Sequence, residues 1–172
     1  SLKLAKKLAF EAKLAGADYI KFQMFTADKL VTKSAKLAKY QKKNNNITSQ
    51  FDLIKNLEFN IDKHEKIIKY CKKIKIGFLS TSFHEDGIDY LIKRKVKFLK
   101  IPSGEINNIP YLRHIGAKKI NILLSTGMSN LLEIEFALKT LIRSGAKKKD
   151  VIILQCNTEY PTPFNDVNLL AM

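Results

Sequence analysis

The chain has 172 residues, of which 45% are hydrophobic and 9% aromatic, so it is long enough to form one sizeable core. Its 7 glycines and 4 prolines exclude a collagen-like or low-complexity chain. No stretch approaches the roughly 18 consecutive apolar residues that a membrane span needs.

The net charge is strongly positive: 31 lysines and arginines against 16 aspartates and glutamates give +15. Only three of the basic residues are arginines, and the lysines are spread along the chain. We interpret the charge mainly as solvated surface, or as a field that attracts an anionic small substrate. A basic module that binds nucleic acid or an acidic polymer is the non-enzyme alternative.

The first half of the chain alternates helical and strand patterns. A helix that Gly16 ends is followed by a strand over 18–23 and a long polar loop over 24–50. A helix is predicted over 49–57. The next helix shows a capping-box pattern in Asp62 and Glu65, and a strand over 77–81 follows it.

The second half continues this alternation. Strands are predicted over 98–101, 120–125 and 151–155. The intervening helices carry Ile88 and Leu91, span residues near 110–116, and begin at Asn130 with a capping box completed by Glu133. That last helix has an apolar stripe that begins at Leu131.

Strands 120–124 and 151–154 are nearly apolar throughout, which predicts burial on both faces in a parallel sheet covered by helices. No glycine-rich nucleotide-binding motif follows the first strand. The fold class is therefore predicted as α/β, a partial (β/α)8 TIM barrel with about five of eight strands. Residues 1–172 form one incomplete barrel domain in this interpretation, which lacks the first strand and the last two.

Polar residues follow every predicted strand, at the end where a parallel barrel carries its active site. Lys21 and Lys100 supply positive charge, and Thr81, Ser103 and Ser125 supply hydroxyl groups. Such a set suits a phosphate or carboxylate, because charge-assisted hydrogen bonds to anions are strong. Glu105 lies among these residues and is a candidate general acid or base.

Other candidates are weaker. His64 and His114 are predicted to face solvent on helices, and Cys156 is predicted to be a small packed residue. No pair of side chains has metal-ligand spacing, so no metal site is predicted from this chain alone. Cys71 and Cys156 form no C-x-x-C motif, which suits a reducing compartment and predicts a cytoplasmic protein.

Five segments, in order, resemble the sialic acid synthase family. They are GADYIKFQ at 16–23, FLSTSF at 78–83, KIPSGEINN at 100–108, LSTGM at 124–128 and CNTEYPTPF at 156–164. The resemblance is collinear over essentially the whole chain. It implies a barrel that condenses phosphoenolpyruvate with an N-acetylated mannose-type sugar, giving a nine-carbon 2-keto acid and phosphate.

The resemblance also implies roles for individual residues. Lys21, Thr81, Lys100, Ser103 and Ser125 would hold phosphoenolpyruvate, and Glu105 would handle protons. The sugar contacts would come from Gln23 and Tyr160, while Asn157 and Thr158 would line the site. A divalent metal ion, manganese or magnesium, is implied for the full-length enzyme, with ligands outside this chain. A homodimer is implied as well.

The first and fifth segments look more like the branch that makes legionaminate than the N-acetylneuraminate branch. The enzymatic alternative is a synthase that uses a phosphorylated aldose, although residues 160–163 argue against it. Because barrel strands are missing, we expect the 172-residue chain alone to be inactive.

Overall fold

A computed structural model describes residues 1–38, 41 and 49–172 of the chain. These residues form two compact units, Ser1–Phe83 and His84–Met172, which we describe one at a time. The single-domain interpretation stays a prediction. The predicted loop over 24–50 contains one short helix, and its residues 39–40 and 42–48 lie outside the described part.

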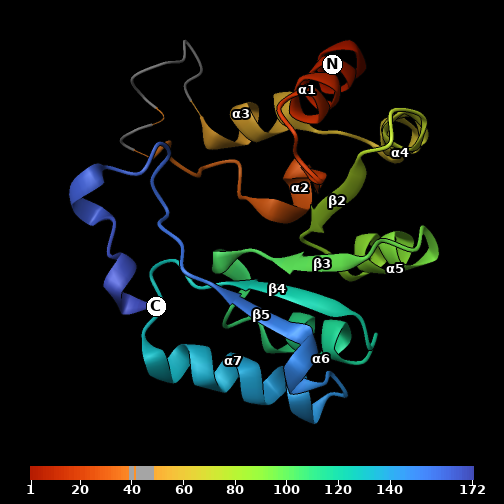
Figure 1. Cartoon of the computed structure of the whole chain (residues 1–172). Helices are drawn as coiled ribbons and strands as arrows, with labels where there is room; N and C mark the ends of the chain where they lie inside the picture. The colour runs from red at the N-terminus through yellow and green to blue at the C-terminus, as the bar shows by residue number, and fades with distance from the viewer. Residues whose placement is uncertain (39–40, 42–48) are drawn as a thin grey trace. The chain divides into compact units, whose positions relative to one another are not determined.

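The first unit joins a two-stranded parallel sheet to four helices (Figure 1). The elements are α1 (Leu2–Leu14), β1 (Tyr19–Met24), α2 (Ala27–Leu30), α3 (Gln50–Leu57), α4 (Ile61–Lys73) and β2 (Gly77–Ser82). Strands β1 and β2 match the predicted ones to within a residue at each end. Their register places Gln23 opposite Thr81 and Lys21 opposite Leu79.

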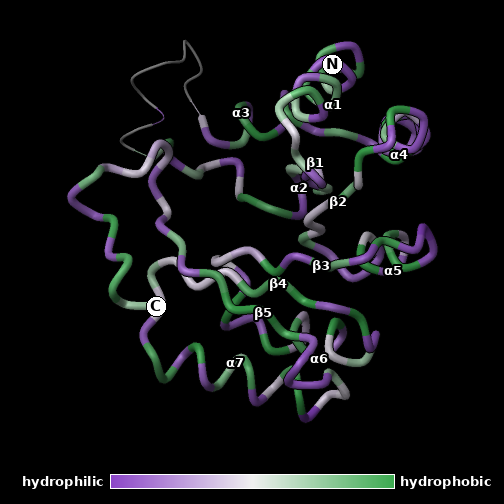
Figure 2. The backbone as a smooth tube through the Cα atoms, viewed as in Figure 1, coloured by the Kyte–Doolittle hydropathy of each residue, from purple (hydrophilic) through white to green (hydrophobic). Residues whose placement is uncertain are grey.

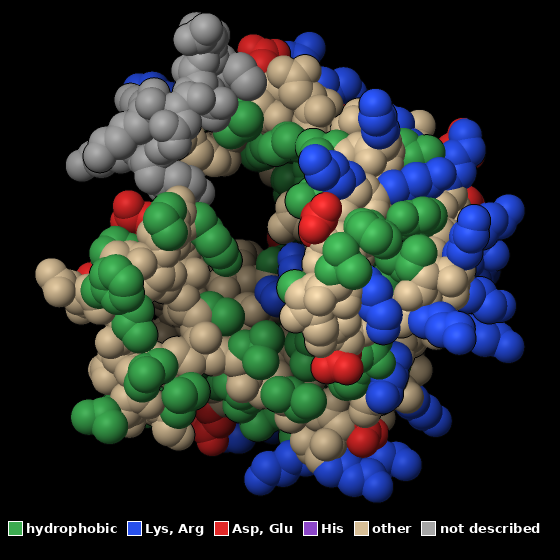
Figure 3. Space-filling view, turned by 45° about the horizontal axis from the view of Figure 1, so that its top comes forward, with side chains coloured by type: hydrophobic (Ala, Val, Ile, Leu, Met, Phe, Trp, Pro, Cys, Tyr) green, Lys and Arg blue, Asp and Glu red, His purple; other side chains and the backbone are tan. Residues whose placement is uncertain are grey.

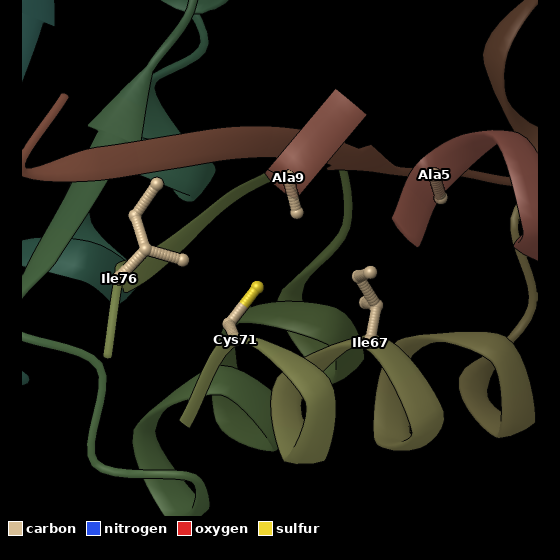
Figure 4. Packing of buried hydrophobic residues seen from close by; sticks show 5 residues of the cluster. All are labelled: Ala5, Ala9, Ile67, Cys71 and Ile76. Atoms are coloured by element: carbon tan, nitrogen blue, oxygen red, sulfur yellow. The ribbon is translucent and has the colours of Figure 1, made fainter. Parts of the chain in front are cut away.

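The core of the first unit lies between α1 and α4. Ala5 and Ala9 of α1 face Ile67 and Cys71 of α4, and Ile76 completes the cluster (Figure 4). All five side chains are at most 6% exposed. The alanines have small side chains, which allows the two helices to approach closely.

The same core decides which face of the first sheet is covered. Ile20, Phe22 and Phe78 pack against it. Because successive strand residues point to opposite faces, Lys21 and Gln23 lie on the other face of the sheet from Ile20 and Phe22. The sequence pattern of β1 therefore separates a structural face from a polar one.

The second unit contains a three-stranded parallel sheet in the order β3-β4-β5 (Figure 1). The strands are β3 (Phe98–Ile101), β4 (Asn121–Ser125) and β5 (Val151–Leu154). The helices are α5 (Glu85–Lys93), α6 (Ile109–Gly116) and α7 (Leu131–Arg143). Short 3-10 turns lie at Ser103–Glu105, Lys148–Asp150, Phe164–Asp166 and Leu169–Ala171.

Alternate residues of β3 and β4 form the buried layer of this unit. Leu99, Ile101, Ile122 and Leu124 are at most 2% exposed, and the register pairs them on one face of the sheet. Helices α6 and α7 pack on each other at Gly116, where a Cβ atom would lie 2.6 Å from the Leu141 carbonyl oxygen. Only a glycine allows this close approach.

The predicted burial of residues 151–154 on both faces is wrong. Ile152 and Ile153 are 47% and 46% exposed, although they are adjacent and point to opposite faces. The reason is the position of β5 at the end of the strand order, with β4 as its neighbour on one side. An apolar sequence indicates that a strand can be buried, but not that a neighbouring element covers it.

One of the two predicted capping boxes is present. Asn130 accepts a hydrogen bond from the Glu133 N–H, and the Glu133 carboxylate accepts one from the Asn130 N–H, as predicted. The box predicted at Asp62 and Glu65 is wrong: α4 begins one residue before Asp62, and the Asn60 side chain accepts from the Lys63 N–H.

The apolar stripe predicted for α7 is partly wrong. Figure 2 shows hydrophobic and hydrophilic residues alternating along this helix. Its buried residues are Ala137, Thr140 and Leu141, whereas Leu131 is 84% exposed. The contact with α6 near Gly116 selects the face around Leu141, so the first turn of α7 is left uncovered.

Charged side chains lie mainly at the surface. Figure 3 shows lysine and arginine side chains projecting from the face in view, beside exposed hydrophobic groups. Among the helices of the described residues, none is long and apolar enough to cross a membrane.

Candidate functional site

The strongest candidate site lies at the carboxyl ends of β3, β4 and β5 in the second unit. At its base, the Lys100 ammonium donates a hydrogen bond to the Ser125 Oγ atom over 2.7 Å. Lys100 is half-buried and Ser125 is 1% exposed. Burial lowers the pKa of Lys100, and the nearby Cys156 sulfur acts in the opposite direction. A cation with reduced hydration attracts an anion more strongly than one in open water.

A second contact joins the segments that follow β3 and β4. The Gly127 N–H donates to the Ser103 Oγ atom over 2.9 Å. A Cβ atom at Gly127 would lie 2.9 Å from Thr158 Cγ2 and 3.0 Å from Ser103 Oγ. Ser103, Gly127 and Thr158 follow three different strands, so the glycine lies where the three strand ends meet.

The two serine hydroxyl groups have the same hydrogen-bond chemistry. Each oxygen accepts a hydrogen bond, Ser125 from the Lys100 ammonium and Ser103 from the Gly127 N–H. Each hydroxyl therefore keeps its own proton for donation to another group. With the Lys100 ammonium, these groups form a set of donors that fits a phosphate or a carboxylate.

Glu105 is the carboxylate beside this donor set, in the 3-10 turn Ser103–Glu105. It is half-buried, and its Oε2 atom accepts a hydrogen bond from Asn108 Nδ2 over 2.7 Å. Tyr111 lies nearby: burial raises the pKa of Tyr111, and the charge of Glu105 adds to that effect. One oxygen of the Glu105 carboxylate is therefore held in place by the Asn108 side chain.

The residues after β5 have mixed surroundings. Thr158 contacts the Gly127 region, as described above. The Asn157 Oδ1 atom accepts from the Glu159 N–H over 2.7 Å, so this oxygen shapes the local turn. Tyr160 is 72% exposed and precedes a cis peptide bond to Pro161. The structure therefore brings Thr158 to the cluster, while the Tyr160 side chain lies largely in solvent.

The first unit holds the remaining predicted residues. Lys21 and Gln23 are exposed at the carboxyl half of β1, and Thr81 is 1% exposed on the neighbouring β2. Paired residues of parallel strands share a face, so Gln23 and Thr81 lie together. Among the described residues, the Thr81 hydroxyl has no hydrogen-bond partner. Such a buried polar group calls for a functional or structural explanation.

A groove lies beside these β1 residues. Its volume is ≈ 370 Å³, and Lys21 and Gln23 line it together with apolar side chains that include Leu4, Leu8 and Phe59. Leu4 and Leu8 are 54% and 52% exposed. Leu4 and Leu8 therefore form a wall of this groove and do not belong to the buried face of α1.

The histidine predictions require correction. His64 is fully buried: its Nδ1 atom lies 3.1 Å from the Asn60 carbonyl oxygen and its Nε2 atom 3.3 Å from Ser80 Oγ. Desolvation by burial lowers the pKa of His64. His114 is half-buried, with its Nε2 atom 3.0 Å from Asp89 Oδ1. Both rings have hydrogen-bond partners at least 16 residues away in the sequence, Ser80 for His64 and Asp89 for His114, which helical spacing alone does not reveal.

Two further observations concern metal ions and thiols. Within the described ranges, no group of three His, Cys, Asp or Glu side chains could hold a metal ion. Cys71 and Cys156 are free cysteines, the first buried and the second half-buried. Burial raises the pKa of Cys71 to about 11.

Sequence reasoning missed two residues of the site. Gly127 is needed because no side chain fits between Ser103 and Thr158, and its signal was a glycine two residues after the end of a buried strand. Asn108 holds the Glu105 carboxylate, and its signal was an asparagine before the Pro110 helix start. Both residues can be seen in the sequence, but only the contacts in the structure show that they belong to the site.

Comparison with known proteins finds similar chains of one family. The chain is 48% identical to the N,N'-diacetyllegionaminic acid synthase of Campylobacter jejuni, over 99% of the chain and 52% of that relative. It is 43% identical to the corresponding protein of Legionella pneumophila, over 99% of the chain and 49% of the relative. The chain thus spans about half the length of the curated relatives it matches.

A solved structure matches the fold. The crystal structure of an N-acetylneuraminic acid synthetase from Leptospira borgpetersenii superposes with a TM-score of 0.82 at 27% identity, covering 99% of the chain and 54% of that structure. The fold is therefore α/β, and its five parallel strands form part of a TIM barrel, as predicted. The NeuB family model matches residues 8–172, and the chain belongs to the NeuB family.

Proposed function

We propose that the protein carrying this chain is a nonulosonic acid synthase of the legionaminate type. It would condense phosphoenolpyruvate with an N-acetylated mannose-type sugar, giving a nine-carbon 2-keto acid and phosphate. The observation that carries the proposal is the donor set of Lys100, Ser103 and Ser125 at the strand ends of a NeuB-family chain. The identity of 48% to a legionaminic acid synthase supports the branch.

In the proposed reaction, Lys100, Ser103 and Ser125 each have a role. The C3 carbon of phosphoenolpyruvate attacks the sugar aldehyde, and positive charge develops at C2. The aldehyde oxygen takes up a proton and becomes a hydroxyl group, and water adds at C2 with loss of one proton. The tetrahedral intermediate then breaks the C2–O bond to the phosphate, and its C2 hydroxyl loses a proton to the leaving phosphate, which leaves a keto group. Lys100 and the two serine hydroxyls stabilise the negative charge of the phosphate throughout. Glu105 accepts a proton from the adding water.

The remaining residues have supporting roles in this proposal. Lys21 and Thr81 bind phosphoenolpyruvate, Gln23 and Tyr160 contact the sugar, and Asn157 and Thr158 line the site. The exposed position of Tyr160 leaves its phenol accessible for such a contact. The enzyme acts as a homodimer in the cytoplasm, where free thiols such as Cys71 and Cys156 persist.

A divalent metal ion, manganese or magnesium, is part of the proposal. The described residues do not supply a ligand set for it. In this proposal the ligands come from parts of the synthase outside this chain, and we assign no step to the ion.

The test is phosphate release by the full-length protein that contains this chain. Phosphoenolpyruvate and manganese are supplied with either N-acetylmannosamine or 2,4-diacetamido-6-deoxymannose, and the Glu105→Gln variant is the control. We expect sugar-dependent phosphate release, faster with the diacetamido sugar and strongly reduced in the variant. A folded protein that releases no phosphate with either sugar would contradict the proposal. A preference for N-acetylmannosamine would contradict only the legionaminate assignment.

A further inference from the structure

We propose that Asn108 is a positioning residue for Glu105: it holds the carboxylate in one orientation while capping helix α6. The inference rests on the proposed function, because it concerns the carboxylate to which that function assigns proton transfer. Asn108 itself touches Glu105 and the helix backbone, and so acts through Glu105.

The two ends of the Asn108 side chain are both engaged. Its Oδ1 atom accepts from the Tyr111 N–H over 3.3 Å, which caps the first turn of α6. Its Nδ2 atom donates to Glu105 Oε2 over 2.7 Å. A rotation of the amide by 180° would remove the capping acceptor and turn a carbonyl oxygen toward the carboxylate. The cap therefore fixes which end of the amide faces Glu105.

The backbone restrains the same segment. The Asn108 N–H donates to the Glu105 carbonyl oxygen over 3.1 Å, and the Glu105 N–H donates to the Pro102 carbonyl oxygen over 3.0 Å. Ile106, between them, is 6% exposed. The turn that carries Glu105 is thus tied to the start of a helix and anchored in the core, and the Asn108 bond sets the last free torsions of the carboxylate.

A comparison with two other asparagine caps separates the roles. Asn60 caps α4 by accepting from the Lys63 N–H, and Asn130 caps α7 by accepting from the Glu133 N–H. In the described structure, neither of their amide nitrogens donates to a carboxylate. Capping alone is served equally well by serine or aspartate. Only asparagine combines a capping acceptor with a donor toward Glu105.

The charged surroundings agree with this geometry. Tyr111 is the titratable group that senses Glu105 from α6, and it is buried, so it does not screen the carboxylate as water would. A charge-assisted hydrogen bond in such a place orients the carboxylate more firmly than one in solvent. Loss of the bond should therefore slow proton transfer without weakening phosphoenolpyruvate binding.

The test uses Asn108→Ser and Asn108→Asp in the full-length protein, each with and without Glu105→Gln. Serine keeps the cap but cannot reach the carboxylate, so kcat should fall about tenfold while KM for phosphoenolpyruvate stays within about twofold. Aspartate is an equally good cap but adds a like charge, so kcat should fall at least as far. The control Asn60→Ser, a cap without a carboxylate partner, should leave kcat unchanged.

The double variants decide between positioning and a purely structural effect. If Asn108 acts through Glu105, Asn108→Ser should change kcat by less than about twofold once Glu105 is glutamine. An equal loss of kcat in both backgrounds, or normal kcat in Asn108→Asp, would overturn the inference while leaving the proposed function intact. A wild-type protein without turnover would overturn the proposed function itself, and this inference with it.

Discussion

Gly127 offers the sharpest test of the geometry of the site. The change is Gly127→Ala, which adds one methyl group where the segments after β3, β4 and β5 meet. The new Cβ atom would lie 2.9 Å from Thr158 Cγ2 and 3.0 Å from Ser103 Oγ. Gly127 does not have a positive φ angle, so the backbone itself accepts alanine and the effect comes from crowding.

The magnitude follows from these distances. Normal contact between such atoms is at about 3.5 to 4.0 Å, so Thr158 and Ser103 must each move by several tenths of an ångström. Overpacking of this size costs about 1 to 3 kcal/mol. The Ser103 movement also lengthens the 2.9 Å hydrogen bond from the Gly127 N–H, which orients the Ser103 hydroxyl in the proposed anion site. We therefore expect lower stability and a higher KM for phosphoenolpyruvate.

The matched control is Gly104→Ala, in the turn that holds Ser103. A Cβ atom there would meet nothing within 4 Å in the described structure, and the residue is exposed. Replacing this glycine should leave stability unchanged or raise it slightly, through the entropy of the unfolded chain. Thermal unfolding and phosphoenolpyruvate titration of the two variants are the assays. Equal Tm and KM values for both variants would refute the packing argument.

Three further predictions concern charge and burial. Lys100→Met should raise the KM for phosphoenolpyruvate at least about tenfold, whereas the surface change Lys93→Met should leave it unchanged. Equal KM values in the two variants would show that Lys100 does not bind phosphoenolpyruvate. Burial lowers the pKa of His64 in the folded chain. Below the ordinary histidine pKa of about 6.5, His64 therefore binds a proton in the unfolded chain more readily than in the folded chain. The urea midpoint of the wild-type protein should therefore fall as the pH drops from 7 to 5, and the midpoint of His64→Gln should fall less. Equal falls of the urea midpoint in the two proteins would contradict this prediction. Iodoacetamide should label Cys156 well before Cys71, as measured by peptide mass spectrometry, because burial raises the pKa of Cys71 to about 11. Equal labelling rates would contradict this prediction and show that the α1–α4 core opens readily.

The strands were the most predictable part of the fold. Residues 98–101 form β3 with the predicted ends, and the other four strands agree to within one residue at each end. Short apolar runs bounded by glycine, lysine or polar turns are a local signal, so no knowledge of tertiary contacts is needed. The start of α7 was equally local, because its capping box involves only Asn130 and Glu133.

Burial was less predictable because it depends on partners far away in the chain. The apolar sequence of β5 is the same whether or not another element covers Ile152 and Ile153. His64 lies on a lysine-rich helix, yet Ser80, 16 residues later, gives its ring a buried partner. Propensity and spacing contain no information about such pairings, so the errors concentrate there.

The residues of the candidate site also fall into a predictable group and an unpredictable group. That Lys100, Ser103 and Ser125 lie near the same end of one sheet could be predicted, because each lies at or just after the carboxyl end of a strand, and parallel strands end on one side of a sheet. Gly127 and Asn108 were not, because their importance lies in what they contact: a crowded junction of three segments and a carboxylate. Strand ends identify which residues can act, whereas contacts identify which residues hold them in place.

Stability and chemistry make opposite demands on the polar groups that the fold buries. An apolar residue at Lys100 or Thr81 would suit the interior better, because a half-buried ammonium loses hydration, and so does a buried hydroxyl that has no partner among the described residues. Lys100 donates a hydrogen bond to the buried Ser125, but neither group caps a helix, so the fold gains little from their polarity. Groups that destabilise the fold without a structural role are the ones that ligand binding explains. That physical reasoning supports an anion site independently of family membership.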